Sequence, residues 1–535
     1  MRNLLDLIQS AARRTPEAQA LVSGDDRLSY RELERHSRAF GRALSALGIE
    51  PGARIAIFLD KRIETVVSML GATAAGCVFV PINPLLKPPQ VAHVLRDSGA
   101  RCLVTSALRM KMLSTEGVVQ VSDAILIDVP DTAPGCPETT VTVHRWPGRE
   151  ITGADDVEDQ QTPPPCVDTD LAALLYTSGS TGLPKGVMLS HRNLLEGAWS
   201  VAEYLGLKAT DRILAALPLS FDAGLNQLTS TWSAGATPVL LNYLSARDAV
   251  QACEREHITA ITGVPPLWMQ LAGATWPHDV RNTLRCFANT GGRLPVPVLH
   301  KLRTLFPHAK PFLMYGLTEA FRSTFLDPAQ VDQRPGSIGK AVPNARVLVV
   351  RADGTPCEPD ETGELVHVGA CVTLGYWNDT ARTAQRYRPS PELKPGDVAR
   401  DIAVWSGDLV RRDKDGFLYF VARNDAQIKS SGYRISPEEI EEMVHASGLV
   451  TEAVAFGIPD EALGEAVALL VVMAGDAATV DDVHSWCTKR LPRYMIPQHI
   501  VSCREIPRNA NGKFDRARLR ATFGSRARVS AERTS

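Results

Sequence analysis

A stretch of eleven residues, 176–186, has the sequence YTSGSTGLPKG and the composition of a phosphate-binding loop. It combines hydroxyl donors, glycines at which backbone N–H groups can approach an anion, and one cation. These residues are Thr177, Ser178, Gly179, Ser180, Thr181, Gly182 and Lys185. A nucleotide P-loop requires Ser or Thr after its lysine, whereas Gly186 follows Lys185 here. The loop instead suits a mobile polyphosphate such as a departing pyrophosphate.

Two other motifs carry charges that phosphate chemistry can use. The segment 315–319, YGLTE, follows a predicted strand, and its Glu319 is a hard oxygen ligand of the kind that Mg²⁺ prefers. The segment 511–516, NGKFDR, contains Lys513, a cation that would stabilise the charge developing where a carboxylate meets a phosphate. In isolation, each motif is more typical of a solvated loop.

Together, and in this order, the motifs resemble those of the adenylate-forming superfamily, which includes acyl-CoA synthetases, adenylation domains of nonribosomal peptide synthetases and firefly luciferase. The resemblance extends over nearly the whole chain. It implies that a carboxylate attacks the α-phosphate of Mg-ATP, and that a thiol then displaces AMP from the acyl-adenylate. The thiol would belong to the phosphopantetheine of CoA or of a carrier protein. The segment 318–324, TEAFRST, is also similar to acyl-CoA ligase-like proteins associated with bacterial exosortase systems.

The resemblance implies a role for each residue of the nucleotide site. The loop 176–186 would grip the β- and γ-phosphates. Thr318 would approach the α-phosphate, Glu319 would ligate Mg²⁺ and Lys513 would lie between the acid and the α-phosphate. The residues implied to contact adenine or ribose are Gly291, Gly292 and Arg293 of an adenine-side loop, Tyr315 and Asp408. Arg423 would contact ribose or phosphate. Ser406 and Ala422 depart from the family's Thr and Gly; the first keeps a hydroxyl, and we expect the second to matter only for structure.

Two residues near position 430 are implied to serve the second step. Asp425 would be the hinge about which a C-terminal module rotates between the two half-reactions. Gly432 would let the pantetheine arm pass close to the backbone.

The glutamate run 438–442 is interpreted as a solvated helix face.

The acid pocket departs from many acyl-CoA synthetases, because the segment 217–224, LPLSFDAG, has Phe-Asp where they carry a histidine. It is similar to peptide-synthetase adenylation domains, in which this Asp pairs with the amino group of an amino acid, so Asp222 is a candidate ammonium ligand. By the same matching the pocket would be lined by Ala223, Asn226, Gly263, Ala288, Thr290, Met314, Arg322 and Ser323. A buried charge needs a partner. Arg322 therefore either clamps a side-chain carboxylate of an acidic amino acid, or pairs with Asp222 and leaves a neutral acid as substrate.

The elements that position these motifs follow an α/β pattern. Apolar runs at 54–59, 77–82, 101–105 and 171–176 predict strands, and the periodicity of 28–47, 64–75 and 90–98 predicts helices, the first capped by Ser29. Such alternation favours layers of parallel sheet and helix. After residue 336, Asp-Gly turn signals indicate β-hairpins or a small barrel.

The predicted fold is thus a large α/β N-terminal domain, residues 1–424, that includes a small β-barrel-like part. A mobile α+β C-terminal domain, 425–523, and a frayed tail, 524–535, follow it.

The composition limits the function classes. The chain has 535 residues, with 58 Lys and Arg against 60 Asp and Glu, which gives no bulk electrostatic reason to expect nucleic acid or an anionic membrane as partner. The ten cysteines form no C-x-x-C pair, which favours reduced thiols in a cytoplasm. No uninterrupted apolar run approaches the ~18–20 residues of a membrane span.

The sequence therefore predicts an AMP-forming acid–thiol ligase that uses ATP, Mg²⁺ and CoA or a separate carrier protein. The alternatives are a CoA ligase for a simple aliphatic or aryl acid, and a non-catalytic nucleotide-binding regulator on the same scaffold.

Overall fold

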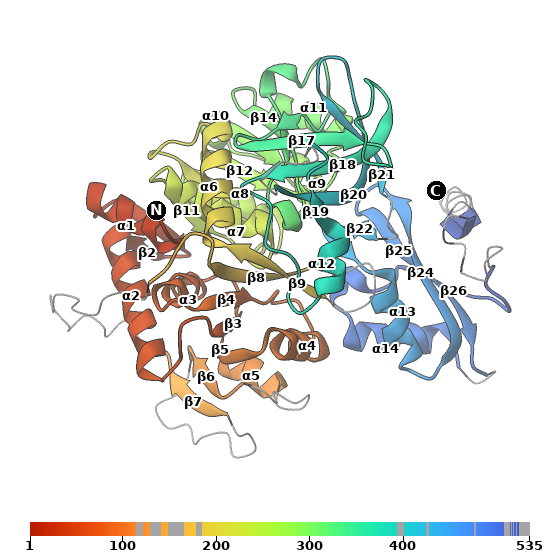
Figure 1. Ribbon diagram of the computed structural model, residues 1–535, viewed down its shortest axis with the longest axis horizontal. Helices are drawn as coiled ribbons and strands as arrows, with labels where there is room; N and C mark the ends of the chain where they lie inside the picture. Colours follow the sequence, from red (N-terminus) through yellow and green to blue (C-terminus); the bar gives the residue numbers. More distant parts are fainter. Residues whose placement is uncertain are drawn as a thin grey trace.

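The computed structural model describes most of the chain. The described residues are 1–113, 121–128, 141–147, 165–177, 184–392, 401–423, 427–475, 478–507, 514, 516, 518–520 and 522–523. Their strands form four sheets: three belong to a large N-terminal domain, and the fourth to a smaller C-terminal domain on the right of Figure 1.

The first sheet has seven strands and carries the predicted phosphate loop at one edge. Its order is β7 (Thr142–Arg145), β6 (Asp123–Leu126), β5 (Ala100–Thr105), β3 (Arg54–Phe58), β4 (Val78–Pro81), β8 (Leu171–Thr177) and β9 (Lys185–Ser190). Strands β7 to β8 are parallel, and β9 returns antiparallel to β8. The connecting helices are α3 (Ile63–Ala74), α4 (Pro88–Ser98) and α5 (Ala107–Leu113). The predicted α/β alternation is confirmed.

Local sequence explains the helix boundaries well. Helix α2 (Tyr30–Ala46) begins after Ser29, whose hydroxyl accepts a hydrogen bond from the Glu32 N–H at 3.2 Å while Glu32 Oε2 accepts from the Ser29 N–H at 2.7 Å. This reciprocal capping box satisfies two helix-end donors. The sequence predicts an apolar stripe of Leu33, Phe40, Leu44 and Leu47 for this helix; the first three are fully buried, and Leu47 is partly buried. The stripe belongs to the largest core of the protein, which joins the first two sheets.

The second sheet has nine strands and positions most of the predicted acid pocket. Its order is β16 (Lys340–Ala341), β15 (Thr324–Leu326), β14 (Lys310–Tyr315), β13 (Cys286–Asn289), β12 (Ala260–Gly263), β10 (Arg212–Ala215), β11 (Thr237–Leu240), β1 (Gln19–Ser23) and β2 (Asp26–Ser29). The run from β14 to β1 is parallel. Its helices are α1 (Leu5–Arg14), α6 (His191–Leu205), α7 (Asp222–Ser233), α8 (Ala246–Arg255), α9 (Pro265–Gly273), α10 (His278–Thr283) and α11 (Val296–Leu305).

The region expected to be hairpins or a small barrel is an antiparallel sheet. It pairs β17 (Ala345–Val350), β18 (Thr362–Gly369), β20 (Ile402–Arg412) and β19 (Tyr387–Pro389) in that order, and β21 (Leu418–Arg423) also pairs with β20. Helix α12 (Thr380–Arg386) precedes β19. The predicted Asp-Gly turn lies between β20 and β21.

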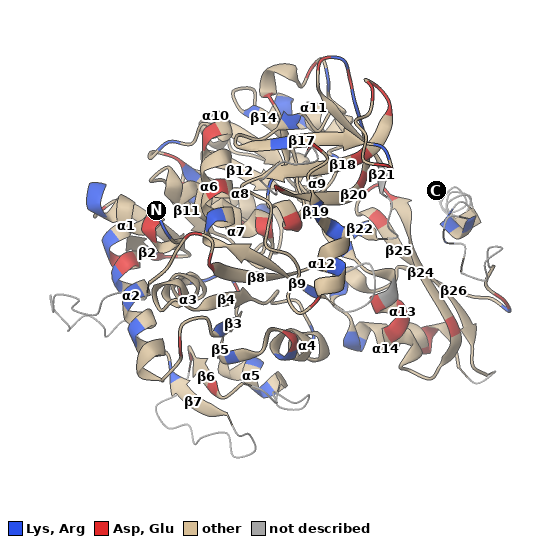
Figure 2. Cartoon of the chain, in the orientation of Figure 1, with Lys and Arg blue, Asp and Glu red and all other residues tan. Residues whose placement is uncertain are grey.

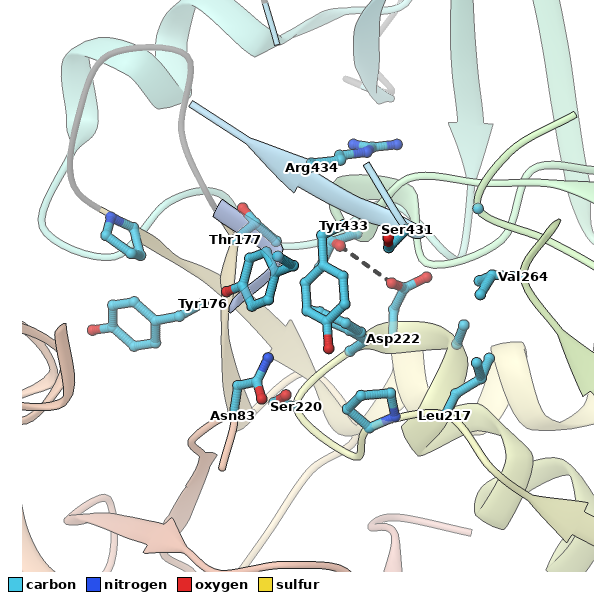
Figure 3. Close-up of a pocket in the computed structure, with 18 of the residues that line it drawn as sticks. Asn83, Tyr176, Thr177, Leu217, Ser220, Asp222, Val264, Ser431, Tyr433 and Arg434 are labelled. Carbon is cyan, nitrogen blue, oxygen red and sulfur yellow. Dashed lines mark hydrogen bonds between the residues drawn. The ribbon is translucent and has the colours of Figure 1, made fainter. Parts of the chain in front are cut away.

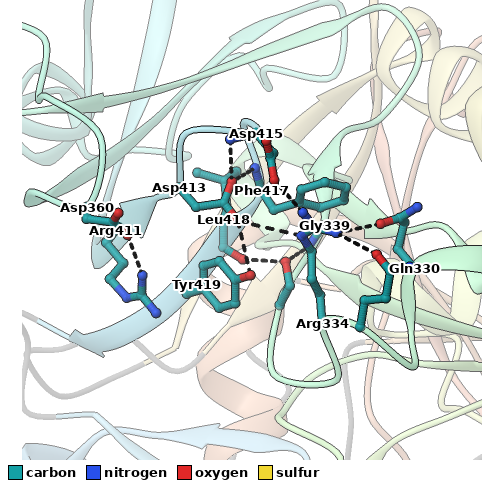
Figure 4. A network of polar contacts seen from close by, with 12 residues as sticks. Gln330, Arg334, Gly339, Asp360, Arg411, Asp413, Asp415, Phe417, Leu418 and Tyr419 are labelled. Atoms are coloured by element: carbon teal, nitrogen blue, oxygen red, sulfur yellow. Dashed lines mark hydrogen bonds and ion pairs between the residues drawn. The ribbon is translucent and has the colours of Figure 1, made fainter.

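A polar network fixes the β20–β21 hairpin to the preceding segment (Figure 4). Asp413 accepts hydrogen bonds from the Phe417 N–H at 2.8 Å and the Tyr419 hydroxyl at 3.1 Å. Arg334 donates to Asp415 at 2.5 Å and lies over the Phe417 ring, 4.2 Å from its centroid. Strand β21, which leads towards the predicted hinge, is therefore held by the large domain.

The C-terminal domain is a five-stranded α+β unit. Its sheet orders β23 (Tyr433–Ile435), β22 (Ile428–Ser430), β25 (Gly464–Met473) and β24 (Val450–Asp460), with β26 (His499–Ser502) also paired to β25. One face packs against α13 (Pro437–His445) and α14 (Val480–Arg490). The other face carries a separate cluster that includes Phe514 and Leu519.

Figure 2 shows basic and acidic residues interspersed along both domains. Within the described ranges, no helix combines the length and the apolarity needed to cross a membrane.

Candidate active site

The site lies where parallel strands of the nine-stranded sheet end. Gly263 on β12 pairs with Asn289 on β13, and Asn289 pairs with Leu313 on β14, so these carboxyl ends lie side by side. Crevices at such ends are the usual ligand sites of α/β sheets. The predicted residues Gly263, Ala288 and Met314 sit on these strands. A Cβ at Gly263 would approach Leu267 and Trp268 to 3.0 Å, which explains why glycine fits here.

Tyr315 and Asp408, which come from different sheets, are joined by a hydrogen bond. The Tyr315 hydroxyl donates to Asp408 Oδ2, and both side chains are buried. Ser406, the departure noted above, donates its hydroxyl to Leu365 O at 2.6 Å and accepts from the Asp408 N–H at 3.1 Å. The substituted hydroxyl therefore supports the Asp408 turn.

Glu319 is a buried carboxylate with one oxygen engaged. Its Oε1 accepts from the Tyr376 hydroxyl at 2.7 Å, whereas Oε2 is buried and has no hydrogen-bond partner among the described residues. Burial alone would raise the pKa of Glu319, but Arg434, Arg386 and the Tyr376 hydrogen bond outweigh it and hold the pKa below its usual range. An ionised carboxylate with an open oxygen fits a hard cation such as Mg²⁺.

The two charges of the predicted acid pocket meet each other. Arg322 Nη1 lies 2.8 Å from Asp222 Oδ2, and their side chains are 4% and 17% exposed. The Thr318 hydroxyl donates to Asp222 Oδ1 at 3.3 Å. The sequence left two partners open for Arg322, a carboxylate of the substrate or Asp222. In the structure Arg322 is paired with Asp222.

A cavity of about 160 Å³ lies beside these groups and is lined directly by Asp222 and Thr318 (Figure 3). The large domain contributes Thr177, Asp222, Ala223, Thr290, Gly291 and Thr318. The C-terminal domain contributes Ser431, Gly432, Tyr433, Arg434, Glu439 and Tyr494. The cavity is therefore closed by both domains.

The β22–β23 hairpin forms the C-terminal wall of the cavity. Gly432 has a φ of +81°, and a Cβ there would lie 3.0 to 3.1 Å from three carbons of Val264. Tyr433 meets Phe221 edge to face, with ring centroids 5.1 Å apart, and stacks on Tyr494 at 3.7 Å. Arg434 donates to Gly316 O at 3.3 Å, next to Thr318.

The interpretation of 438–442 as a solvated face is wrong for Glu439. This residue is 5% exposed, and its Oε1 accepts from Gln90 of α4 at 2.9 Å. Burial raises the pKa of Glu439 to about 7. Glu441 Oε1 also accepts a hydrogen bond, from the Ala455 N–H at 2.7 Å. Glu439 therefore lies at the interface between the domains, whereas Glu441 bonds within the C-terminal domain, and a single-helix pattern reveals neither contact.

Sequence reasoning also missed Arg434, Tyr376 and Arg386 around Glu319. Arg434 lies in the same segment as Gly432, and its charge beside a glycine turn was the one available signal. Tyr376 and Arg386 are distant in sequence from Glu319 and carry no such signal.

Several predicted residues lie apart from this cavity or outside the described residues. Lys185 pairs with Asp379 at 3.5 Å, and Arg293 is exposed beside Gly336. The calls outside the described residues are Ser178, Gly179, Ser180, Thr181, Gly182, Asp425, Lys513 and the side chain of Arg423. Phe514, which follows Lys513, packs on the face of the C-terminal sheet opposite α13.

Comparisons with known proteins identify the family of the chain. Residues 8–377 match the family model "AMP-binding enzyme", and residues 439–513 match "AMP-binding enzyme C-terminal domain". The chain is 31% identical over 530 residues to L-proline–[L-prolyl-carrier protein] ligase of Pseudomonas fluorescens, covering 97% of this chain and 99% of that protein. It is 30% identical to long-chain-fatty-acid–CoA ligase of Salmonella typhimurium, covering 97% and 94%.

Multidomain proteins and solved structures match as well. Tyrocidine synthase 3 of Brevibacillus parabrevis is 30% identical over 97% of this chain, which spans 8% of that protein. A structure of o-succinylbenzoate CoA synthetase from Bacillus subtilis superposes with a TM-score of 0.80 at 27% identity, covering 97% of this chain and 98% of the other. The chain therefore belongs to the family of AMP-binding enzymes.

Proposed function

We propose that this protein is an ATP-dependent, AMP-forming acid–thiol ligase. In the first step a carboxylate oxygen attacks the α-phosphorus of ATP, and the bond to the β-phosphate breaks to release pyrophosphate. In the second step a thiol sulfur attacks the acyl carbonyl, the bond to AMP breaks, and the thiol proton leaves. The thiol belongs to the phosphopantetheine of CoA or of a separate carrier protein.

One observation carries the proposal most directly. Thr318 borders the cavity, and the same short segment holds Glu319 with its open oxygen and Tyr315 bonded to Asp408. An aromatic ring and a carboxylate suit adenine and the ribose hydroxyls, and a hydroxyl beside them suits the α-phosphate. The relatives include both CoA ligases and a carrier-protein ligase, which supports a thiol acceptor.

The other predicted residues complete the first step. Gly291 and Gly292 lie against adenine, with Arg293 at the outer side, and Arg423 contacts ribose or phosphate. Lys185 and the hydroxyls of the loop 176–186 hold the leaving pyrophosphate. Lys513 stabilises the charge that develops between the acid and the α-phosphate, where a fixed cation is most effective.

Glu319 is the residue that would hold Mg²⁺, which neutralises phosphate charge when bound. Tyr376 orients the carboxylate through its hydrogen bond at 2.7 Å. In the arrangement of this structure, Arg434 and Arg386 keep it ionised, as their lowering of its pKa indicates.

The present arrangement is that of the second step. Gly432 and Tyr433 line the cavity, whereas Phe514, next to Lys513, packs on the opposite face of the C-terminal sheet. Rotation about Asp425 would exchange Gly432 for Lys513. The functional units are then residues 1–424 and 425–523, with 524–535 as a tail, in a protein of the cytoplasm.

The ion pair favours one of the substrate alternatives. Because Asp222 is already paired with Arg322, a CoA ligase for an acid without an amino group agrees better with the site than an amino acid ligase. A regulator without catalysis would have no use for an ionised Glu319 that has one oxygen without a hydrogen-bond partner among the described residues and follows Thr318 of the cavity.

A pyrophosphate-release screen tests the proposal. Amino, fatty, aryl and dicarboxylic acids are supplied with ATP and Mg²⁺, and active acids are then tested with CoA and with a carrier protein. We expect acid-dependent pyrophosphate release, followed by AMP and a thioester. ATP binding without release across the whole panel would indicate the regulator instead.

A further inference from the structure

The ion pair Asp222–Arg322 lies at one side of the cavity, where Asp222 is a lining residue. Arg322 Nη1 donates to Asp222 Oδ2 at 2.8 Å and to Phe321 O at 2.9 Å, while Thr318 engages Asp222 Oδ1 at 3.3 Å. A substrate ammonium that took Asp222 would leave the guanidinium buried without its counter-charge. Breaking a buried pair by removing one partner is strongly destabilising. The pair therefore disfavours α-amino acids.

Arg322 retains one unused donor. Its side chain is 4% exposed, and Nε is buried with no hydrogen-bond partner among the described residues. A buried donor without an acceptor carries a desolvation penalty. A ligand oxygen at this position would remove that penalty.

The space beside Arg322 is small. A second cavity of about 20 Å³ is lined by Arg322 and shares Ala223 with the main cavity. Its other walls include Asn226, Met314 and Cys286. A space of this size holds about one water molecule or a comparable group. A long acyl chain does not fit in this direction.

We propose that the acid is short and carries a neutral oxygen acceptor, a hydroxyl or an oxo group, at the end that Arg322 binds. This inference rests on the proposed function. A second carboxylate is a poorer match because it would add a like charge beside Asp222, and like charges at close range repel strongly where water is excluded.

The test is acid-dependent ATP–pyrophosphate exchange with acids of matched length. The panel contains butyrate, 3-hydroxybutyrate, 4-hydroxybutyrate, acetoacetate, succinate, 4-aminobutyrate, decanoate, proline and aspartate. We expect kcat/KM for the best hydroxy or oxo acid to exceed that for butyrate by about tenfold or more, because a site built to bind a substrate oxygen rejects the analogue that lacks it. A wild-type preference for decanoate, an amino acid or plain butyrate would overturn the proposal.

Two variants separate recognition from folding. Arg322→Lys keeps the positive charge for Asp222 but lacks the Nε–H, so the ratio of kcat/KM for the best hydroxy or oxo acid to kcat/KM for butyrate should fall to about one. The double variant Asp222→Asn with Arg322→Met leaves no unpaired charge and should lose the same selectivity. Unchanged selectivity in both folded variants would contradict the role of Arg322. Absence of exchange with every acid in the broad screen would instead refute the proposed function.

Discussion

The two walls of the cavity are built in different ways. On the large-domain wall, polar groups are hydrogen-bonded within their own domain: Asp222 accepts from Thr318 at 3.3 Å and from Arg322 at 2.8 Å. On the C-terminal wall they are bonded across the interface. Arg434 donates to Gly316 O at 3.3 Å, and Glu439 accepts from Gln90 at 2.9 Å.

Because of this difference, we expect the two walls to serve different ligands. The large-domain wall keeps its bonds whatever the C-terminal domain does, so it suits the nucleotide and the acid, which are needed in both steps. The C-terminal wall would lose few hydrogen bonds on leaving, and a typical one contributes only ~1 kcal/mol net. It suits groups needed in one step alone.

The largest effect is expected from Lys513→Ala. Removal of a cation placed at developing charge should reduce acid-dependent pyrophosphate release by about 10²–10³-fold. Thioester formation from supplied acyl-adenylate should persist, because the proposed second step does not use Lys513. Lys414→Ala, which changes an exposed turn lysine, is the matched control. Unchanged adenylation by the Lys513 variant would show that the two walls do not alternate as proposed.

An intermediate effect on the opposite step is expected from Gly432→Ala. The new Cβ would meet Val264 at 3.0 to 3.1 Å, so we expect thioester formation to fall by about tenfold while pyrophosphate release changes little. Gly448→Ala is the control, since Gly448 also has a positive φ, +67°, but open space around its Cβ position. Equal loss of both steps would mean that the hairpin does not serve the thiol step selectively.

The smallest effect concerns pH. In this structure the C-terminal domain is docked on the large domain, with Glu439 bonded to Gln90. In this docked arrangement burial raises the pKa of Glu439 from its ordinary value of 4.5 to about 7. Docking of the C-terminal domain therefore favours the protonated Glu439 carboxyl, and this docking should weaken as pH rises through about 7.

Glu439→Gln removes this titration. We expect thioester formation by wild type to decline several-fold relative to the variant between pH 6 and pH 8.5, when supplied acyl-adenylate is the substrate. Glu461→Gln, at an exposed position of the same domain, should behave as wild type. Parallel pH profiles for wild type and Glu439→Gln would exclude an interface role for this carboxyl.

The large-domain wall was the more predictable of the two. Its residues follow strands that a simple apolar pattern reveals, and Tyr315, Thr318 and Glu319 lie within five positions of one another. The predicted strand before this segment is β14, Lys310–Tyr315. Short-range patterns suffice because the parallel sheet brings the strand ends together.

The C-terminal wall was less predictable because its meaning depends on distant contacts. Gln90 and Glu439 are 349 positions apart, and a helical pattern alone assigns a glutamate run to solvent. The Asp222–Arg322 pair, 100 positions apart, was recognised as one of two alternatives, but only packing decides between them.

The proposed rotation of the C-terminal domain between the two steps can be tested by cross-linking the domain to the large domain in the docked arrangement. Gln90→Cys combined with Glu439→Cys places thiols on the two sides of the interface, where the native side chains are 2.9 Å apart, and a short bis-maleimide can then join them. We predict that the cross-linked protein forms thioester from supplied acyl-adenylate at the rate of the unlinked double variant, yet releases no pyrophosphate from ATP and acid. Pyrophosphate release at the unlinked rate would contradict the account.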